Sequence, residues 1–146
     1  GATWGHRIIK ELQSGTSGWI YWNLILNQTG GPFLYSPSHS DGPANLQQPV
    51  IVVDTEAKEY YTTGLFWFMA HFSRFVRPGA VRLATKERAL QEGVSAVGFE
   101  ATAEEYHVKV LQLVNKKQSE EKVTVCARGD VAEVTMPASS ITTARW

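Results

Sequence analysis

Cysteine is nearly absent from this chain, and two other common sequence signals are missing with it. The single Cys126 excludes an internal disulfide framework and a cysteine-rich metal site, and we expect neither a metal nor a cofactor. Lysine plus arginine equals aspartate plus glutamate at 14 each, so nothing points to nucleic acid or an anionic membrane as a partner. Apolar runs stay well below the roughly 18 residues of a membrane-spanning helix, so we expect no transmembrane segment.

The chain does contain enough apolar residues for a packed core. Hydrophobic residues make up 43% of its 146 residues, which excludes a disordered tail. That length suits one ordinary domain or pieces of two. Aromatic residues reach 11%, with five tryptophans. Such residues usually build a core, and exposed tryptophans also form sugar-binding surfaces.

The first 80 residues alternate helical and strand patterns. Residues 4–12 place apolar side chains on one face at helical spacing, and residues 19–26 form an apolar strand expected to be covered on both sides. After a long loop at 27–49, residues 50–53 predict a short buried strand, and residues 60–76 predict a second helix. The order helix, strand, loop, helix is typical of an α/β barrel.

After about residue 80 the pattern changes to short strands separated by charged or turn-like stretches. These strands are expected at residues 81–83, 95–99, 106–114, 122–127, 131–136 and 139–144. Regular short strands without intervening helices indicate an antiparallel β-sandwich. We therefore predict an α/β part at residues 1–80 and an all-β part at residues 81–146.

Neither part is long enough to be complete. A TIM barrel takes about 250 residues, and this chain holds roughly one of its eight units. An Ig-like sandwich usually needs about 100 residues, more than residues 81–146 provide. We expect the chain to be the tail of a larger protein. An incomplete barrel should expose apolar strand edges, which predicts a partner chain, aggregation or instability.

Trp22 and Asn23 are the strongest candidates for substrate binding. The pattern places them near the carboxyl end of the first strand, where barrel enzymes gather their functional groups. An indole face can stack on a sugar ring, and an amide can bond two hydroxyls. The alternative is a buried tryptophan beside an asparagine that satisfies a turn.

Catalytic carboxylates are not evident in the pattern. Glycoside hydrolysis needs two carboxyl groups that flank the scissile bond, about 5–9.5 Å apart, and no pair of acids falls at two strand ends. Asp54 closes the second strand and could be read as catalytic. Because Asp-Thr readily bonds the backbone that follows, a turn residue is the favoured interpretation.

Several other polar motifs have simple structural explanations. His71 lies among aromatic residues of the second helix, where packing or a backbone bond is expected rather than a metal. Residues 128–130 match an adhesion tripeptide, yet between two strands they predict a hairpin turn. Residues 27–29 form a glycosylation sequon that matters only in a secreted protein. His39 in the long loop could contact substrate or solvent.

Several stretches resemble the last part of glycoside hydrolase family 30. Residues 18–24 read Gly-Trp-Ile-Tyr-Trp-Asn-Leu, followed by Gly-Gly-Pro at 30–32 and the strand at 50–54. Residues 71–80 resemble the family's last barrel helix and the link to its sandwich. Residues 137–143, together with the final Trp146, resemble its closing strand. The resemblance covers nearly the whole chain in order, and it is strongest to the glucosylceramidase (acid β-glucosidase) members.

The resemblance implies a (β/α)8 barrel with an attached β-sandwich and retaining hydrolysis of the β-glucosidic bond of glucosylceramide-type glycolipids. Residues 1–80 would be the last helix–strand–helix segment of the catalytic domain, and residues 81–146 the C-terminal sandwich. The two catalytic glutamates would lie upstream of Gly1, so the missing N-terminal part would be a partner and this chain alone would be inactive. Trp22 would line the glucose pocket, while Asn23 would hold the strand end. A secreted or lysosomal location and peripheral lipid contact would follow.

The sequence departs from the family pattern at positions that concern the aglycone side of the pocket. Tyr21 stands where the family commonly has aspartate, Phe33 stands where it often has asparagine, and the loop at 35–48 looks longer. A family 30 β-1,6-glucanase or xylanase is therefore the enzymatic alternative. A non-catalytic carbohydrate-binding sandwich module is the alternative from another class. It would need a row of exposed aromatics, and beyond residue 80 the chain has only three: Phe99, Tyr106 and Trp146.

Overall fold

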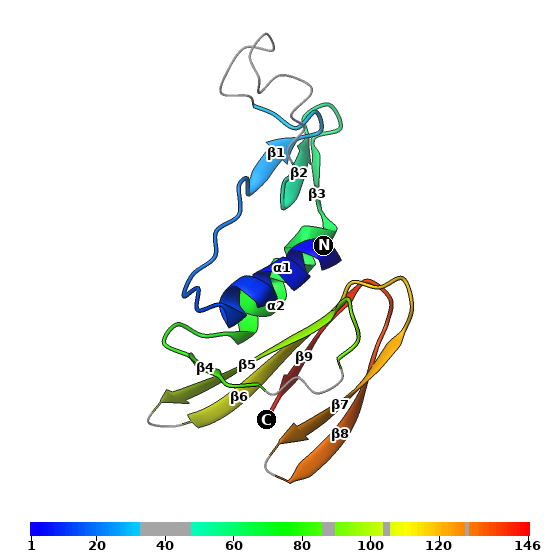
Figure 1. The fold of residues 1–146 in the computed structure, drawn as a ribbon. Coiled ribbons are helices and arrows are strands. Elements are labelled where there is room, and N and C mark those ends of the chain that lie inside the picture. The colour runs from blue at the N-terminus through cyan, green and yellow to red at the C-terminus, as the bar shows by residue number, and fades with distance from the viewer. Residues whose placement is uncertain (33–47, 86–89, 104–105, 128) are drawn as a thin grey trace.

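The computed structural model describes residues 1–32, 48–85, 90–103, 106–127 and 129–146 of the chain. Figure 1 shows its helices and strands in space. In chain order they are α1 (Ala2–Gln13), β1 (Ile25–Asn27), β2 (Ile51–Asp54), β3 (Glu59–Thr62), α2 (Gly64–Phe75), β4 (Val81–Leu83), β5 (Val94–Ala103), β6 (Tyr106–Asn115), β7 (Glu121–Ala127), β8 (Asp130–Met136) and β9 (Ser140–Arg145).

A four-stranded antiparallel sheet forms the middle layer of the molecule. Its strand order is β4-β5-β6-β9, and each neighbouring pair runs antiparallel. Helices α1 and α2 lie side by side across one face of this sheet, and the β7-β8 hairpin lies on the other side (Figure 1). The six short strands expected after residue 80 are all present; β6, β7 and β8 are one residue longer than predicted, and β5 is five residues longer.

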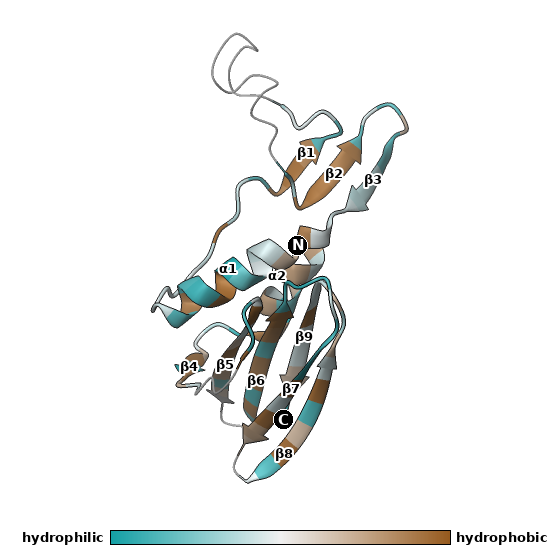
Figure 2. Cartoon of the chain, turned by 45° about the vertical axis from the view of Figure 1, so that its right-hand side comes forward, coloured by the Kyte–Doolittle hydropathy of each residue, from teal (hydrophilic) through white to brown (hydrophobic). Residues whose placement is uncertain are grey.

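The helix-facing side of the sheet carries the main core. Alternate residues of β5 and β6 point toward the helices, because successive side chains of a strand face opposite sides. Figure 2 shows hydrophobic bands along β5 and β6 and alternating hydrophobic and hydrophilic bands along α1. The fully or nearly buried members of this cluster are Ile9, Phe68, Val97, Phe99 and Val114. Ile9, Val97 and Val114 are fully buried, so α1 and the sheet exclude water completely between them.

The opposite side of the sheet packs on the β7-β8 hairpin. The residues that alternate with the first set point this way and meet apolar side chains of the hairpin. The buried members of this cluster are Val94, Ala96, Leu111 and Leu113 of the sheet and Met136 of β8. The sheet is therefore covered on both faces, by helices from the first part of the chain and by a hairpin from the second. The change of sequence pattern near residue 80 does not separate two cores.

A ring of hydrogen bonds also ties α2 to the sheet. The Gln112 side chain is fully buried; its amide nitrogen donates to the His71 carbonyl at 2.9 Å and its oxygen accepts from the Thr143 hydroxyl at 2.7 Å. Because that hydroxyl has a single hydrogen, Nδ1 of His71 is the donor in the 2.7 Å bond between them. Burial lowers the pKa of His71, which keeps the ring neutral. The expectation of a packed histidine is confirmed, and its ring is bonded to the Thr143 side chain rather than to the backbone.

A small second sheet stands beyond the N-terminal ends of both helices (Figure 1). β1 pairs with β2 in parallel, and β2 pairs with β3 antiparallel. Two sequence expectations need correction here. The predicted strand at 19–26 is confined to Ile25–Asn27, and the predicted helix at 60–76 begins at Gly64 because residues 59–62 form β3.

Both corrections have a hydrogen-bonding cause. Val50 N donates to the Asn23 carbonyl, and Ile51 N donates to the Leu24 carbonyl. The stretch at 19–26 therefore forms its first hydrogen bonds to the start of β2 only at Asn23. Within the described ranges, residues 19–22 pair with no other strand. Tyr60 and Tyr61 pair with Val53 and Val52, and this register places β3 where a helical turn was expected.

Close helix–helix contact generates a first prediction. Gly5 is a buried residue of α1, and a Cβ atom there would collide with the Phe68 ring of α2 and approach Val114 Cγ2 to 3.3 Å. Gly5→Ala should lower the free energy of unfolding by about 1–3 kcal/mol, although alanine normally stabilises a helix relative to glycine by about 1 kcal/mol. Urea denaturation followed by tryptophan fluorescence measures the effect.

Gly18→Ala is the matched control, because no atom lies within 4 Å of the corresponding Cβ position. That variant should unfold at the parent's midpoint. If Gly5→Ala proves as stable as the parent or more so, α1 and α2 do not pack as described.

Candidate functional site

The stretch that follows α1 has two different sides. Along residues 19–24 the exposure alternates: Trp19, Tyr21 and Asn23 are half-buried, whereas Ile20, Trp22 and Leu24 are 94%, 75% and 59% exposed. An alternation of period two is what an extended chain produces when one side rests on another element. One row of side chains is therefore used for packing, and the other row is open.

The packed row rests on α1. The ring of Tyr21 meets the Trp4 ring edge-on with centroids 5.0 Å apart, and Trp19 stacks on Tyr21 at 5.9 Å. The Trp19 indole N–H donates to Glu11 Oε2 at 2.6 Å. Glu11 lies in the last turn of α1 and Trp4 in the first, so this stretch runs antiparallel to the helix. Trp22 thus comes next to the N-terminal end of α1.

One ion pair supports this aromatic cluster. Arg7 Nε donates to Glu11 Oε1 at 2.7 Å, and the Arg7 guanidinium stands 5.4 Å from the centroid of the Trp4 ring. The hydrogen bond from Arg7 is the largest cause of the lowered pKa of Glu11, and the bond from Trp19 lowers it further. Glu11 is therefore an ionised, fully engaged carboxylate that orients Trp19, and a general acid is not what this geometry provides.

Tyr21 lies on the helix side of the stretch, away from Trp22. Its hydroxyl donates to the Gln48 carbonyl at 2.7 Å, and partial burial raises the pKa of the phenol. The sequence identified position 21 as a departure from the family pattern that concerns the substrate. Within this chain Tyr21 contacts Trp4, Trp19 and the Gln48 carbonyl, and its relation to the substrate stays a prediction.

Trp22 and Asn23 need a positional correction as well. They were expected near the carboxyl end of the first strand, but they precede β1 and are joined by a cis peptide bond. The Asn23 carbonyl accepts from Val50 N at 3.2 Å, so Asn23 marks the place where the chain begins to pair with β2. Trp22 projects its indole from the open side immediately before this point.

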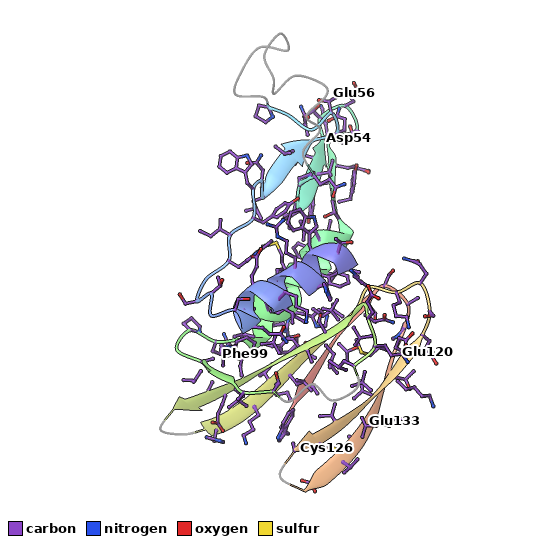
Figure 3. The ribbon with its side chains drawn as sticks, in the orientation of Figure 1. Asp54, Glu56, Phe99, Glu120, Cys126 and Glu133 are labelled. Carbon is purple, nitrogen blue, oxygen red and sulfur yellow. The ribbon has the colours of Figure 1, made fainter. Side chains whose placement is uncertain are left out.

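Asp54 is a turn residue, as the sequence favoured. Its Oδ1 accepts hydrogen bonds from the backbone N–H groups of Glu56 and Ala57 at 3.0 and 2.9 Å. Figure 3 shows Asp54 and Glu56 together at the β2–β3 turn, and Glu120 and Glu133 on the sandwich at the other end of the molecule. Asp54 at the end of β2 lies opposite Glu59 at the start of β3 in the antiparallel pair, but Asp54 Oδ1 is taken up by two backbone N–H groups of the turn. We therefore do not assign these two acids as the pair for glycoside hydrolysis.

The remaining sequence motifs have structural positions. Asn27 Oδ1 accepts from Thr29 N, Thr29 Oγ1 and Gly31 N, so this sequon residue closes the turn after β1. The β7-β8 hairpin closes with Ala127 opposite Asp130, and Gly129 has a φ of +93°, as expected for a tight turn. His39 and Phe33 lie outside the described residues.

Two further features of the structure bear on ligands. In the described ranges, His, Cys, Asp and Glu side chains nowhere gather in a group of three that could hold a metal ion, and no helix there is long and apolar enough to cross a membrane. A groove of about 700 Å³ lies at the C-terminal ends of the two helices, lined by Leu12, Trp19, Phe72, Val76 and Phe99 among others. Trp22 is not part of it.

Comparison with protein families divides the chain into two matched parts. Residues 1–76 match the model of the glycosyl hydrolase family 30 TIM-barrel domain. Residues 79–144 match the model of the family 30 beta sandwich domain. The two matches together cover nearly the whole chain and agree with the change of pattern from helices and strands to strands alone.

Known proteins with similar sequences are much longer. The chain is 33% identical over 114 residues to putative glucosylceramidase 4 of Caenorhabditis elegans, covering 76% of this chain and 19% of that protein. It is 33% identical over 84 residues to the lysosomal acid glucosylceramidase of Mus musculus, covering 58% and 16%. It is 30% identical over 118 residues to an endo-1,6-beta-D-glucanase of Neurospora crassa, covering 80% and 24%. The chain thus spans less than a quarter of each.

Solved structures support the same assignment. SrfJ from Salmonella typhimurium superposes with a TM-score of 0.82 at 28% identity, over 99% of this chain and 29% of that protein. The endo-beta1,6-glucanase BT3312 gives 0.74 at 25% identity, over 94% and 28%. The prediction of a barrel end followed by a β-sandwich is confirmed, and this chain belongs to glycoside hydrolase family 30.

Proposed function

We propose that this chain is the C-terminal portion of a retaining β-glucosidase that acts on glucosylceramide-type glycolipids. The observation that carries the proposal is the placement of Trp22. Its indole is 75% exposed on the side of residues 19–24 that faces away from α1. In a TIM barrel the helices form the outer ring, so the side away from a helix is the side of the barrel interior.

The height of Trp22 along the barrel supports the same role. Helices run antiparallel to the strands they follow, so the N-terminal end of α1 marks the face where the strands end. Residues 19–21 run from the last turn of α1 to its first turn, which brings Trp22 to that face. Active sites of TIM barrels lie there. Trp22 would form one wall of the glucose pocket by stacking on the sugar ring.

Asn23 would complete this wall from the backbone. Its carbonyl is bonded to Val50 N, which fixes the chain directly after the indole. A half-buried amide side chain beside the sugar can donate and accept at once, as neighbouring hydroxyls require. Trp22 would then supply the apolar face and Asn23 the polar edge of one subsite.

The chemistry itself would come from the rest of the protein. Retaining hydrolysis uses one carboxylate as nucleophile and a second carboxyl group as acid and then base, about 5–5.5 Å apart. Asp54 is engaged in a turn, and Glu11 and Glu121 are engaged in ion pairs; both catalytic groups would be glutamates on strands outside this chain. Residues 1–80 would close the barrel, and the sheet formed by residues 81–146 would pack against α1 and α2.

The names of the relatives favour this substrate. Proteins named glucosylceramidase from a nematode and from mouse both match at 33% identity. A secreted or lysosomal location, with peripheral lipid contact, would follow from a glycolipid substrate. The second candidate is hydrolysis of β-1,6-glucan, supported by the similarity to one sequence and one structure with that activity in their names. The partner in either case is the part of the same protein that carries the remaining barrel strands.

Activity measurements separate these functions. The full-length protein should release glucose from glucosylceramide and from a fluorogenic β-glucoside, whereas residues 1–146 alone should show no turnover because both carboxylates are elsewhere. β-1,6-Glucan should be a poor substrate of the full-length protein. Preference for β-1,6-glucan would replace the first candidate by the second. Turnover by the isolated chain would contradict the assignment of the carboxylates to other segments.

The role of Trp22 gives a prediction for mutants of the full-length protein. Trp22→Ala should raise KM for the β-glucoside by about tenfold, and Trp22→Phe by less, because a smaller ring still stacks. Trp67→Ala is the matched control: Trp67 is 59% exposed on α2 and touches Phe66 edge-on. Steady-state kinetics decide the matter, and equal KM values for Trp22→Ala and Trp67→Ala would remove Trp22 from the pocket.

Asp54 gives the opposite expectation. Asp54→Asn keeps the Oδ1 acceptor for Glu56 N and Ala57 N, so kcat of the full-length protein should stay within about twofold of the parent. A fall of several hundredfold, the usual result of removing a catalytic carboxylate, would restore Asp54 as a candidate for catalysis.

A further inference from the structure

The chain that leads into β2 is held by an unusual series of hydrogen bonds. Three consecutive carbonyl oxygens, those of Gln48, Pro49 and Val50, all accept bonds from outside their own strand. Pro49 and Val50 are both buried, so their carbonyls have little access to water. The backbone position of residues 48–50 therefore depends on the hydrogen bonds to these carbonyls.

Thr63 makes three contacts with two of these carbonyls. Its hydroxyl, whose single hydrogen is shared, lies 3.0 Å from the Pro49 carbonyl oxygen and 3.1 Å from that of Val50. Its backbone N–H donates to the Val50 carbonyl at 3.0 Å. Thr63 occupies the N-cap position of α2, where a threonine hydroxyl normally accepts from the helix backbone, yet it makes no side-chain cap bond here. The hydroxyl is turned toward the strand instead.

Tyr21 holds the same segment from the other side. Its hydroxyl donates to the Gln48 carbonyl at 2.7 Å, while its ring is fixed between Trp4 and Trp19. One bond thus comes from the stretch that carries Trp22, and the others come from the start of α2. The segment in turn donates two bonds back: Val50 N to the Asn23 carbonyl and Ile51 N to the Leu24 carbonyl.

We propose that Tyr21 and Thr63 are positioning residues that clamp residues 48–50 and thereby set the orientation of the Trp22 indole and the Asn23 amide toward the sugar. The role in sugar binding rests on the function proposed above. The clamp itself rests on the hydrogen bonds alone. Tyr21 is the residue at which this chain departs from the family's aspartate, so the clamp gives this departure a physical role away from the substrate.

The experiment uses the full-length protein and four single variants. Tyr21→Phe and Thr63→Val each remove one clamping hydroxyl and keep the rest of the side chain. Tyr60→Phe and Thr124→Val are matched controls, since Tyr60 is 75% exposed on β3 and Thr124 is exposed on β7. Hydrogen–deuterium exchange of the peptide that contains Val50 and Ile51 is measured together with kcat and KM for a fluorogenic β-glucoside.

Both clamp variants should exchange faster at Val50 and Ile51 and raise KM by about three- to tenfold, with kcat within about twofold of the parent. Thr63→Ser restores the hydroxyl and should restore both values. Unchanged exchange would overturn the clamp. Faster exchange with an unchanged KM would overturn its link to the sugar site. A parent protein without β-glucosidase activity would overturn the proposed function, and the exchange data would still decide whether the clamp exists.

Discussion

The packing of α1 and α2 on one face of the β4-β5-β6-β9 sheet is the interaction on which the rest of the structure depends. Ile9, Val97 and Val114 are completely buried at this contact, and Gln112 joins it with a buried hydrogen-bond ring to α2. Burial of several large apolar side chains contributes roughly 1.5–3 kcal/mol each. Because the helices belong to the barrel part and the sheet to the sandwich, this contact fixes the two parts relative to each other.

The orientation of the site follows from that contact. One side of α1 packs on the sheet. Trp4, Arg7 and Glu11 lie on another side, which contacts the stretch that runs antiparallel to the helix. Trp19 and Tyr21 occupy this surface, so the side chain between Tyr21 and Asn23 must point away from it. The exposure of Trp22 thus follows from the packing of α1 on the β4-β5-β6-β9 sheet, which Trp22 itself does not join. The sheet of the sandwich part thus influences the position of the indole that we propose as a wall of the sugar pocket.

The sequence was most informative where structure is local. The short strands after residue 80 follow from alternation of apolar and polar residues, and the turn at Asp54 follows from an aspartate that bonds the next backbone groups. The sequence-based prediction failed where hydrogen bonds between distant segments determine which residues form a strand. Apart from Asn23, the run from Trp19 to Leu26 consists of large aromatic and aliphatic residues, so composition did not show where pairing with β2 begins. Composition also did not distinguish the β-forming pair Tyr60 and Tyr61 from the first turn of a helix.

The side on which each residue of the 19–24 stretch lies was also beyond sequence reasoning. Trp19, Ile20, Tyr21 and Trp22 are all large and apolar, and no polar alternation marks an inside and an outside. Contact with Trp4, at a separation of 15 or more residues, makes the distinction. The same long-range contact packs the Tyr21 ring on α1, which the sequence did not predict.

The most direct test of this account is a crystal structure of the full-length protein with a glucosyl group trapped in its active site. The account predicts that the Trp22 indole lies in van der Waals contact with the sugar ring, about 4 Å away, while Tyr21 remains packed on Trp4 and bonded to Gln48. A sugar bound elsewhere, or one contacted by Tyr21 with Trp22 turned onto α1, would contradict it.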